Sequence, residues 1–358
     1  MATIINSVAD LQAIASNMAG EYELGADIDL HGVNWIPIGA SADQNTRPTE
    51  FSGTFDGKGH KISNLTINSN TRGEYNQIGL FAALEGCTIS NLVIDNANIT
   101  CEGYSPHVGI LAGRAYYTRP TITNVSVQGV MFVTHVSGSD TGNPSVAGLV
   151  GCLYGSNTVS ITDCISTAEI HVYGCSKTLH VAGFIGYGRD VLLTRCFAFG
   201  DITIENTSDS GINVSTMQSV CYYTEHRYSA SAVSIYGAST NTVSSCGKYL
   251  TSSQSFTQTN SRRIWYAVTV PYETYTDTST LSISQADFIA LTSGNSTAWN
   301  TENVDFANGK YLKLAIDKET VIAYDLTIAG QTFNGVKRVI YNGNALKKLT
   351  LNGTDYTF

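Results

Sequence analysis

Short apolar runs that contain a glycine recur along the middle of the chain, and an alternating apolar and polar run follows each of them. The glycine-containing runs are residues 78–81, 108–111, 147–151 and 182–186. The runs that follow are residues 89–94, 122–127, 161–165 and 193–197, with a further copy at 62–67. A third alternating run completes each unit, as at residues 131–136, 169–172 and 201–205. Three strands repeated every 30 to 40 residues predict coils that stack on one another.

Stacking predicts ladders of equivalent side chains, because each coil pairs with the next at a spacing of about 4.8 Å. The first inward ladder consists of Leu65, Leu92, Val125, Cys164 and Cys196. A second column consists of Ile67, Ile94 and Val127. The repeated glycine permits a tight corner or a close backbone contact where a side chain would collide. The expected fold class is therefore all-β with stacked strands.

Polar residues mark the corner of each coil. Asn64, Asn91 and Asn124 are expected to bond to one another and to the next backbone, as amide ladders do, and not to bind a ligand. The same column continues as Asp163 and Arg195, which carry opposite charges on adjacent coils. The sequence therefore predicts an ion pair between them.

The Gly-Leu-x-Gly units followed by Ile-x-Asn-Leu resemble the GLUG repeats of bacterial adhesin-like proteins. Residues 22–30, 34–39 and 51–60 are similar to the lead-in of that family, and Trp299 with residues 308–312 is similar to its closing segment. Lys310 and a missing proline depart from the closing pattern. The resemblance covers about residues 1–316 and implies a right-handed parallel β-helix, or solenoid. It leaves function open, because this scaffold serves adhesion, surface display and some enzymes.

The pattern predicts four regions. Residues 1–20 form an N-terminal cap with a short helix, since Ser7 and Asp10 fit a capping box. Residues 21–250 form the β-helix, and residues 251–316 form terminal coils and a closing cap with a second capping box at Ser284. Residues 317–358 carry Asn-Gly pairs between alternating runs, which predict a small β-hairpin module of about four strands.

The tail carries a second resemblance. Residues 336–343 and 347–354 resemble the Lys-x-x-Tyr-x-Asn-Gly modules at the ends of virion proteins of tailed bacteriophages. This implies a virion protein assembled in the host cytoplasm. The amino terminus shows no signal-peptide pattern, and no apolar run of about 18 residues occurs, so we expect no membrane insertion.

Composition narrows the choice of partners. Charged residues make up 14% of the chain and the formal net charge is −9, which gives no basic footprint for nucleic acid. Of eight cysteines, Cys164, Cys196 and Cys246 recur at one repeat position and read as small apolar fillers, although a disulfide between stacked cysteines stays open outside a cell. No Cys-x-x-Cys occurs and the histidines are scattered, so we expect neither metal nor cofactor.

The acidic residues argue against catalysis. A glycan-cleaving site needs two carboxylates about 5 to 10 Å apart in an open groove. Asp27 with Asp29, and Asp201 with Glu205, are the available pairs, and neither has a companion His or Arg cluster. The expectation is a protein that is not an enzyme.

Tyrosines are the candidate contact residues, because their rings offer flat apolar faces with a hydroxyl that suit sugars and protein partners. The residues expected to contact carbohydrate or a receptor are Tyr116, Tyr117, Tyr222, Tyr223, His226 and Tyr228. The alternative for the group from Tyr222 to Tyr228 is that it closes the end of the solenoid.

The favoured function is a structural virion protein, a tail or head appendage that displays the solenoid for attachment to host-surface carbohydrate or another receptor. Residues 317–358 would dock to other virion proteins or to sister chains, and a homo-oligomer such as a trimer is expected. Two alternatives stay open: a bacterial cell-surface adhesin and a phage tailspike that depolymerises polysaccharide.

Overall fold

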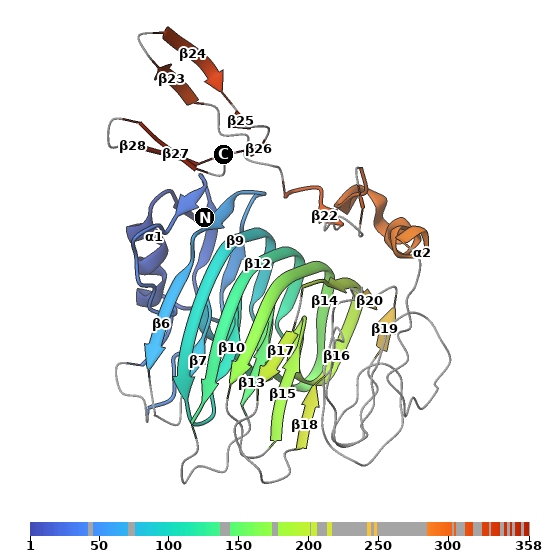
Figure 1. The fold of residues 1–358 in the computed structure, drawn as a ribbon. Coiled ribbons are helices and arrows are strands. Elements are labelled where there is room, and N and C mark those ends of the chain that lie inside the picture. Colours follow the sequence, from blue (N-terminus) through green and yellow to red (C-terminus); the bar gives the residue numbers. More distant parts are fainter. Residues whose placement is uncertain are drawn as a thin grey trace. The chain divides into compact units, whose positions relative to one another are not determined.

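Parallel strands dominate the first of the two units into which the chain divides, Met1–Asp317, and antiparallel hairpins make up the second, Lys318–Phe358 (Figure 1). The structure is a computed structural model of the 358-residue chain. It describes residues 1–41, 46–70, 76–136, 144–173, 178–200, 202–205, 213–216, 242–244, 247–248, 285–302, 304–305, 312–317, 324–328, 331–336, 340–341, 344–345, 348–351 and 354–357.

The larger sheet of the first unit contains 15 strands, paired in parallel. Its strands are β1 (Thr3–Ile5), β2 (Glu21–Leu24), β3 (Ile28–Asp29), β4 (Thr54–Asp56), β5 (Lys61–Ser63), β6 (Thr66–Asn70), β8 (Phe81–Leu84), β9 (Thr88–Gly103), β11 (Ala112–Thr118), β12 (Thr121–His135), β14 (Val150–Tyr173), β16 (Ile185–Ala198), β17 (Ile202–Glu205), β19 (Thr242–Ser244) and β20 (Gly247–Lys248). The sequence prediction of an all-β protein with parallel strands is confirmed.

A second parallel sheet contains five short strands, which come from the glycine-containing runs and the segments before them. They are β7 (Gln77–Ile78), β10 (His107–Gly109), β13 (Ser145–Ala147), β15 (Thr178–Ala182) and β18 (Asn213–Thr216). A side-chain carbon added at Gly79 would collide with the carbonyl oxygen of Gly109 in the next strand. Glycine is therefore required there for close backbone contact.

The strand register shows that the chain stacks in layers. A layer is one passage of the chain, and its strands pair with the equivalent strands of the next passage. Leu92 pairs with Val125, and Cys164 pairs with Cys196. β12 and β14 pair through Thr123 with Thr162 and Ser126 with Ile165, which places Val125 opposite Cys164. Four of the five residues of the expected first ladder thus lie one above another, and all four are fully buried.

The second and third expected strands of each repeat are continuous in β9, β12 and β14, which bend at the corner residue. In β12 the corner residue is Asn124, whose φ of 57° lies in the left-handed region. Ile122 and Val125, on either side of it, are both buried. A left-handed residue turns the strand, so the inward alternation resumes one position later.

Leu65, Ile67 and Asn64 belong to different columns from those expected. Ile62 pairs with Ile94 and Ile67 pairs with Ile99, so the segment 62–67 matches the second corner of the next layer and not the first. Asn96, which marks that second corner, also has a left-handed φ of 53°. Both corners share an apolar-x-Asn-apolar pattern, and the sequence alone assigned this copy to the wrong one.

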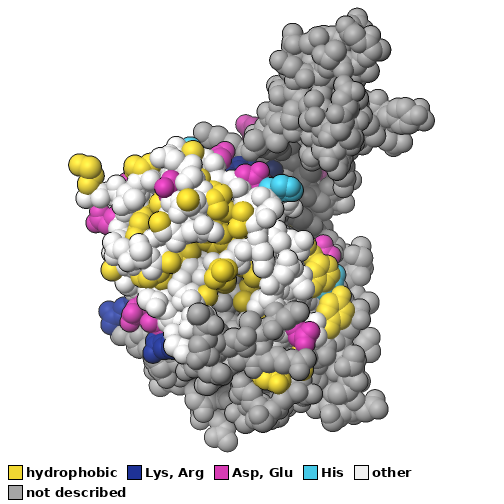
Figure 2. Space-filling view, turned by 90° about the vertical axis from the view of Figure 1, so that its left-hand side faces the viewer, with side chains coloured by type: hydrophobic (Ala, Val, Ile, Leu, Met, Phe, Trp, Pro, Cys, Tyr) yellow, Lys and Arg dark blue, Asp and Glu magenta, His cyan; other side chains and the backbone are white. Residues whose placement is uncertain are grey.

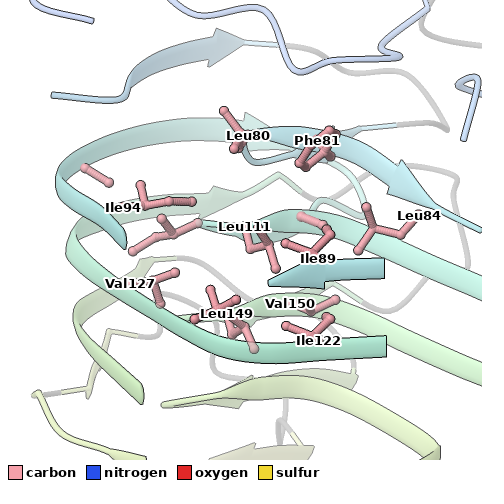
Figure 3. Close-up of a cluster of buried hydrophobic side chains, with 14 of the residues drawn as sticks. Leu80, Phe81, Leu84, Ile89, Ile94, Leu111, Ile122, Val127, Leu149 and Val150 are labelled. Carbon is pink, nitrogen blue, oxygen red and sulfur yellow. The ribbon is translucent and has the colours of Figure 1, made fainter. Parts of the chain in front are cut away.

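Aliphatic and aromatic side chains fill the interior between the strands (Figure 3). Ile89 pairs in register with Ile122, and Phe81, Leu111 and Leu149 are fully buried beside them. Burial of each such side chain contributes about 1.5 to 3 kcal/mol to stability. The core is therefore a continuous apolar column shared by successive layers.

Helix α1 (Val8–Ala13), continued by a 3₁₀ turn (Ile14–Ser16), lies at the amino-terminal end. The Ser7 Oγ accepts a hydrogen bond from the Asp10 N–H at 3.2 Å, and the Asp10 carboxylate accepts one from the Asn6 N–H at 3.0 Å. Leu11 and Ile14 are fully buried. The expected capping helix at residues 1–20 is present, and its apolar side packs into the core.

The described residues of the range 285–317, here called the closing segment, contact one side of the stacked layers. The segment contains α2 (Gln285–Ala290), 3₁₀ turns (Leu291–Ala298), β21 (Trp299–Asn300) and β22 (Lys313–Leu314). β21 pairs with β22 antiparallel, and β22 contacts β12 and β14. Asp317 at its end forms an ion pair with Lys61 at 3.1 Å.

The second unit, Lys318–Phe358, consists of three antiparallel hairpins among its described residues. Their strands are β23 (Tyr324–Ile328), β24 (Gln331–Val336), β25 (Ile340–Tyr341), β26 (Asn344–Ala345), β27 (Lys348–Leu351) and β28 (Thr354–Thr357). The sequence predicted about four strands here. The pair Asn334-Gly335 lies inside β24 and not at a turn, so an Asn-Gly pair did not always mark a hairpin loop.

Candidate functional site

The tyrosines expected to contact a ligand do not form a described site. Tyr116 and Tyr117 lie on strand β11 and not in a turn, because β11 pairs with β8 and β14. The structure does not describe their side chains. The other four expected contact residues lie outside the described residues: Tyr222, Tyr223, His226 and Tyr228.

The asparagine corner is a hydrogen-bonded ladder. Asn124 Nδ2 donates to Asn91 Oδ1 at 2.9 Å, and Asn91 Nδ2 donates to Asp56 Oδ1 at 3.0 Å. Asn64 lies on the second corner, where its Nδ2 donates to Asp29 Oδ1 at 2.7 Å and its Oδ1 accepts from Asn96. These hydrogen bonds join adjacent layers, so the role of the amides is structural.

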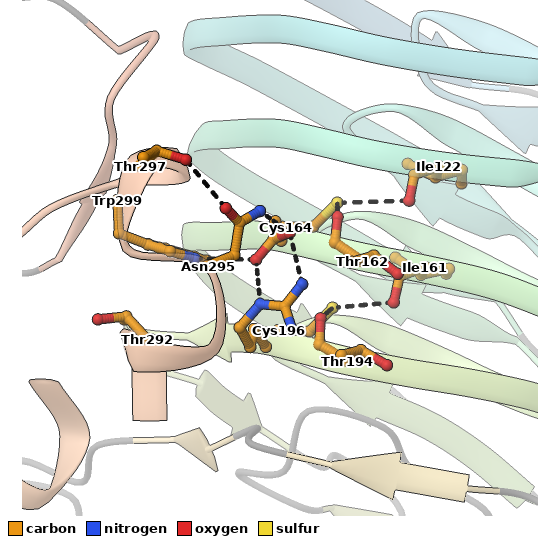
Figure 4. Close-up of polar contacts among 12 residues, drawn as sticks. Ile122, Ile161, Thr162, Cys164, Thr194, Cys196, Thr292, Asn295, Thr297 and Trp299 are labelled. Atoms are coloured by element: carbon orange, nitrogen blue, oxygen red, sulfur yellow. Dashed lines mark hydrogen bonds and ion pairs between the residues drawn. The ribbon is translucent and has the colours of Figure 1, made fainter. Parts of the chain in front are cut away.

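The expected ion pair between Asp163 and Arg195 is present and anchors the closing segment. Figure 4 shows Asn295 and Trp299 of that segment beside the strands that carry Cys164 and Cys196. The Arg195 guanidinium donates to both carboxylate oxygens, at 2.5 and 2.8 Å. Asn295 Nδ2 donates to the same carboxylate at 2.8 Å, and Trp299 Nε1 donates at 3.0 Å. Burial opposes ionisation of Asp163, but the hydrogen bonds from Arg195, Asn295 and Trp299 outweigh it and hold its pKa below the ordinary value.

This buried carboxylate is structural because its partners belong to the protein. Asp163 is 2% exposed, and the Trp299 ring contacts Phe197 edge to face with centroids 4.9 Å apart. A second apolar cluster beside it contains Ile165, Phe197, Phe199, Trp299, Leu312 and Leu314. Asp163 therefore fixes the polar edge of a packed apolar contact.

The described cysteines are all buried. They are Cys87, Cys101, Cys152, Cys164 and Cys196. Burial raises the pKa of the Cys87, Cys101 and Cys152 thiols to about 12. A thiol at that pKa holds its proton at neutral pH and is a poor nucleophile or metal ligand. These residues fill the core.

The acidic pair Asp27 and Asp29 binds turns within the first layers. Asp27 Oδ1 accepts from the Lys61 N–H at 3.0 Å and lies 2.9 Å from His60 Nδ1. Asp29 Oδ1 accepts from the His31 N–H at 2.9 Å. For the second pair, Asp201 and the Glu205 side chain lie outside the described part of the chain.

A partly exposed aromatic pair lies on the outer face formed by the second halves of β9, β12 and β14. Phe132 on β12 pairs in register with His171 on β14, and their rings stack with centroids 4.8 Å apart and planes 14° from parallel. Phe132 is 37% exposed. His171 Nε2 lies 2.8 Å from Glu169 Oε1. The sheet thus holds two flat rings and a carboxylate in fixed positions at the surface.

The outward neighbours of this pair are Val130 and Thr134 on β12 and polar residues on β9 and β14. We call the outward residues Asn98, Thr100, Glu102, Phe132, Glu169 and His171 the aromatic face. Thr100 pairs in register with Phe132, and Asn98 and Glu102 lie two positions before and after Thr100 on the same side of β9. The ionisable side chains of this face are two carboxylates and one imidazole.

Sequence reasoning missed this face because it searched for tyrosines. The sequence does contain a signal, because residues 131–136 and 169–172 are equivalent runs of successive repeats. This equivalence puts Phe132 one layer from His171, as the strand register shows. What the alignment lacked was the direction of each side chain.

A second exposed apolar area lies at the end that carries α1. Ile4 on β1 is 49% exposed and Ile36 is 74% exposed. Figure 2 views this end and shows hydrophobic side chains between uncharged ones, with few charged groups.

Within the described ranges, no three His, Cys, Asp or Glu side chains are grouped to hold a metal ion. The printed sequence also contains no His-Glu-x-x-His zinc motif. Among the same described residues, no helix combines the length and apolar character needed to cross a membrane.

Part of this chain matches a peptidase family model, and another comparison finds a protein of a different kind. Residues 6–129 match the family described as the M26 IgA1-specific metallo-endopeptidase N-terminal region. An alignment of 160 positions that covers 41% of this chain is 33% identical to halomucin of Haloquadratum walsbyi. The chain spans about 2% of that relative's length.

Two solved structures resemble the fold distantly. One is a crystal structure of a putative immunoglobulin A1 protease from Bacteroides ovatus, at 14% identity and a TM-score of 0.37, covering 88% of this chain and 93% of that one. The other is an IgA1 protease, at 16% identity and a TM-score of 0.39, covering 83% of this chain and 27% of that one. At these values neither likeness bears on function.

The expectation that the protein is not an enzyme is corrected by the M26 match, because the matched region is part of a metallo-endopeptidase. The sequence argument considered only glycan cleavage by paired carboxylates and so did not weigh a peptidase. The described residues nevertheless do not fit a catalytic metal, since no group of candidate ligands converges among them. No catalytic step can be assigned to them.

Proposed function

We propose that the stacked layers form a right-handed parallel β-helix that recognises the macromolecular substrate of an M26-like peptidase. The match of residues 6–129 to the N-terminal region of that family supports this proposal. In this role the described layers hold the substrate, and peptide cleavage belongs to metal ligands other than the described residues.

The observation that carries the proposal is the aromatic face. Phe132 and His171 form a rigid stacked pair on strands, beside the carboxylates of Glu102 and Glu169. Side chains fixed on strands bind with less loss of conformational entropy than side chains on loops. An outer face that repeats at a constant layer spacing also suits an extended ligand, because equivalent positions recur along it.

The test is direct binding of the full chain to immobilised immunoglobulin A1, measured by surface plasmon resonance. We expect Phe132→Ala to weaken binding at least tenfold, because it removes the exposed ring. Ile36→Ala is the matched control, since it truncates an even more exposed apolar side chain at the other area. Absence of binding by the unmodified chain, or equal loss in both variants, would contradict the proposal.

A virion or cell-surface attachment protein is a second proposal, with the GLUG repeats displayed and residues 318–358 docking to neighbouring proteins or sister chains. The separate hairpin unit Lys318–Phe358 favours it, because about forty residues bury too little core to stand alone. Host-surface glycan or protein would be the receptor, and a homo-oligomer such as a trimer is expected. Labelling phage particles and bacterial cells with an antibody to this chain separates the two locations; labelling of neither removes both.

A further inference from the structure

The stacked rings of the aromatic face end at Phe132. The outward column of which Phe132 is part runs through Asn68, Thr100, Phe132 and His171, each paired in register with the next. One face of the Phe132 ring stacks on His171. On the other side the next residue is Thr100, whose short side chain cannot cover an aromatic ring. The 37% exposure of Phe132 is consistent with this open face.

The space over Thr100, here called the step, has an apolar side chain on one side and polar side chains beside it. Phe132 forms the wall, and Thr100 forms the floor one layer away, at a spacing of about 4.8 Å. Asn98 and Glu102 flank Thr100 along β9, both outside the core. A ligand there meets one aromatic face, a hydroxyl, an amide and a carboxylate, which together accept and donate hydrogen bonds around its rim.

The charge of the face selects against ionic sugars. The named residues of the face include Glu102 and Glu169 but no Lys or Arg, so they offer no fixed cation to pair with a uronic or sialic acid. A neutral sugar ring has an apolar C–H face for stacking and hydroxyl groups at its edge for the carboxylate and amide. We infer that this step is a binding site, or seat, for one neutral pyranose, whose ring stacks on the open face of Phe132 above Thr100. The inference rests on the proposed recognition role and names the ligand class of that same surface.

The test uses the full chain and free sugars, so that it does not depend on immunoglobulin binding. Neutral oligosaccharides built from galactose, mannose or N-acetylglucosamine are titrated by calorimetry and by saturation-transfer NMR. We expect at least one to bind, with Phe132→Ala at least tenfold weaker and Phe132→Trp retained within threefold. Thr100→Trp fills the seat and is expected to weaken binding at least tenfold, whereas Ile36→Ala leaves it unchanged.

Two competing probes decide the ligand class. Oligosaccharides of uronic acid and a Lys- and Arg-rich peptide are titrated in parallel. Preference for either over all neutral sugars, or binding of no neutral sugar, overturns the inference. Thr100→Trp adds volume at an exposed position and so provides an independent result if Phe132→Ala does not fold.

The two proposals fail separately. Immunoglobulin A1 binding that is lost in Phe132→Ala without any sugar binding overturns the pyranose seat and leaves the recognition role. Sugar binding that is lost in Phe132→Ala, with no immunoglobulin binding, supports the seat and removes the recognition role proposed for that substrate.

Discussion

Strands β9, β12 and β14 contribute to two outer faces, of which one is covered by the closing segment and the other is exposed. After the first corner, the outward residues Val93, Ser126 and Ile165 of β9, β12 and β14 are at most 6% exposed, and the closing segment lies beside them. After the second corner, the outward residues include Thr100 and Phe132, which stay exposed. The first face is largely apolar. If it were exposed it would favour association with other protein surfaces, so it has to be covered. The second is polar around one aromatic pair, and its exposure has no such cost.

The largest expected effect comes from uncovering the first face. Trp299→Ala removes the ring that packs on Phe197 and donates to Asp163, and it leaves a cavity. We expect a loss of about 3 to 5 kcal/mol in the free energy of unfolding. Chemical denaturation followed by circular dichroism measures it.

Phe132→Ala is the control for that experiment, because it truncates an aromatic residue on the uncovered face. We expect less than about 1 kcal/mol, as for surface substitutions. Similar losses for Trp299→Ala and Phe132→Ala would show that the two faces do not differ in the way described.

A smaller effect is expected from the anchor itself. Asp163→Asn removes the charge that Arg195 pairs with and should cost about 2 to 3 kcal/mol at pH 7. The folded pKa of Asp163 is lowered, so its stabilisation is complete above the unfolded pKa of about 3.9 and is lost as pH falls through the folded value. The stability difference between the parent and Asp163→Asn should therefore shrink below about pH 4. A difference that is constant from pH 7 to pH 3 would show that the charge is not the cause.

A smaller effect than that at Asp163 is expected at the first corner, which precedes the covered face. Asn91→Ala keeps a Cβ at a φ of 52° and removes the hydrogen bonds to Asp56 and Asn124, and we expect a cost of about 1 to 2 kcal/mol. Asn91→Gly also removes the hydrogen bonds but tolerates the left-handed φ, so it should be less damaging. Thermal unfolding of both variants measures this. Equal losses would assign the whole effect to the side chain and none to the backbone.

Local patterns predicted those features that depend on one repeat and its neighbour. The ladder of Leu92, Val125, Cys164 and Cys196 and the pair of Asp163 with Arg195 follow from aligning successive copies of the repeat. The Ser7 capping box follows from four consecutive residues. The assignment of Asn64 failed because each layer has two left-handed corners with the same local pattern.

The candidate site was not predicted, because it depends on which side of the sheet stays uncovered. Phe132 and His171 alternate with core residues in ordinary strands, and nothing in those runs marks them as exposed. Their exposure follows from the path of the closing segment, which covers Ile165 and Phe197. That path joins Trp299 to Asp163 across 136 positions of the chain.

The sequence by itself determined that this chain stacks parallel strands at a repeating period, with glycine at the close contacts and a polar residue at each bend, because each depends on residues within one period. Only the tertiary structure decided which outer face the returning segment covers and which stays open to a ligand. The reason is that the covering segment and the covered face are distant in the sequence. Their position depends on where the buried Asp163 carboxylate and the apolar side chains beside it contact Trp299, and not on the pattern of either segment alone.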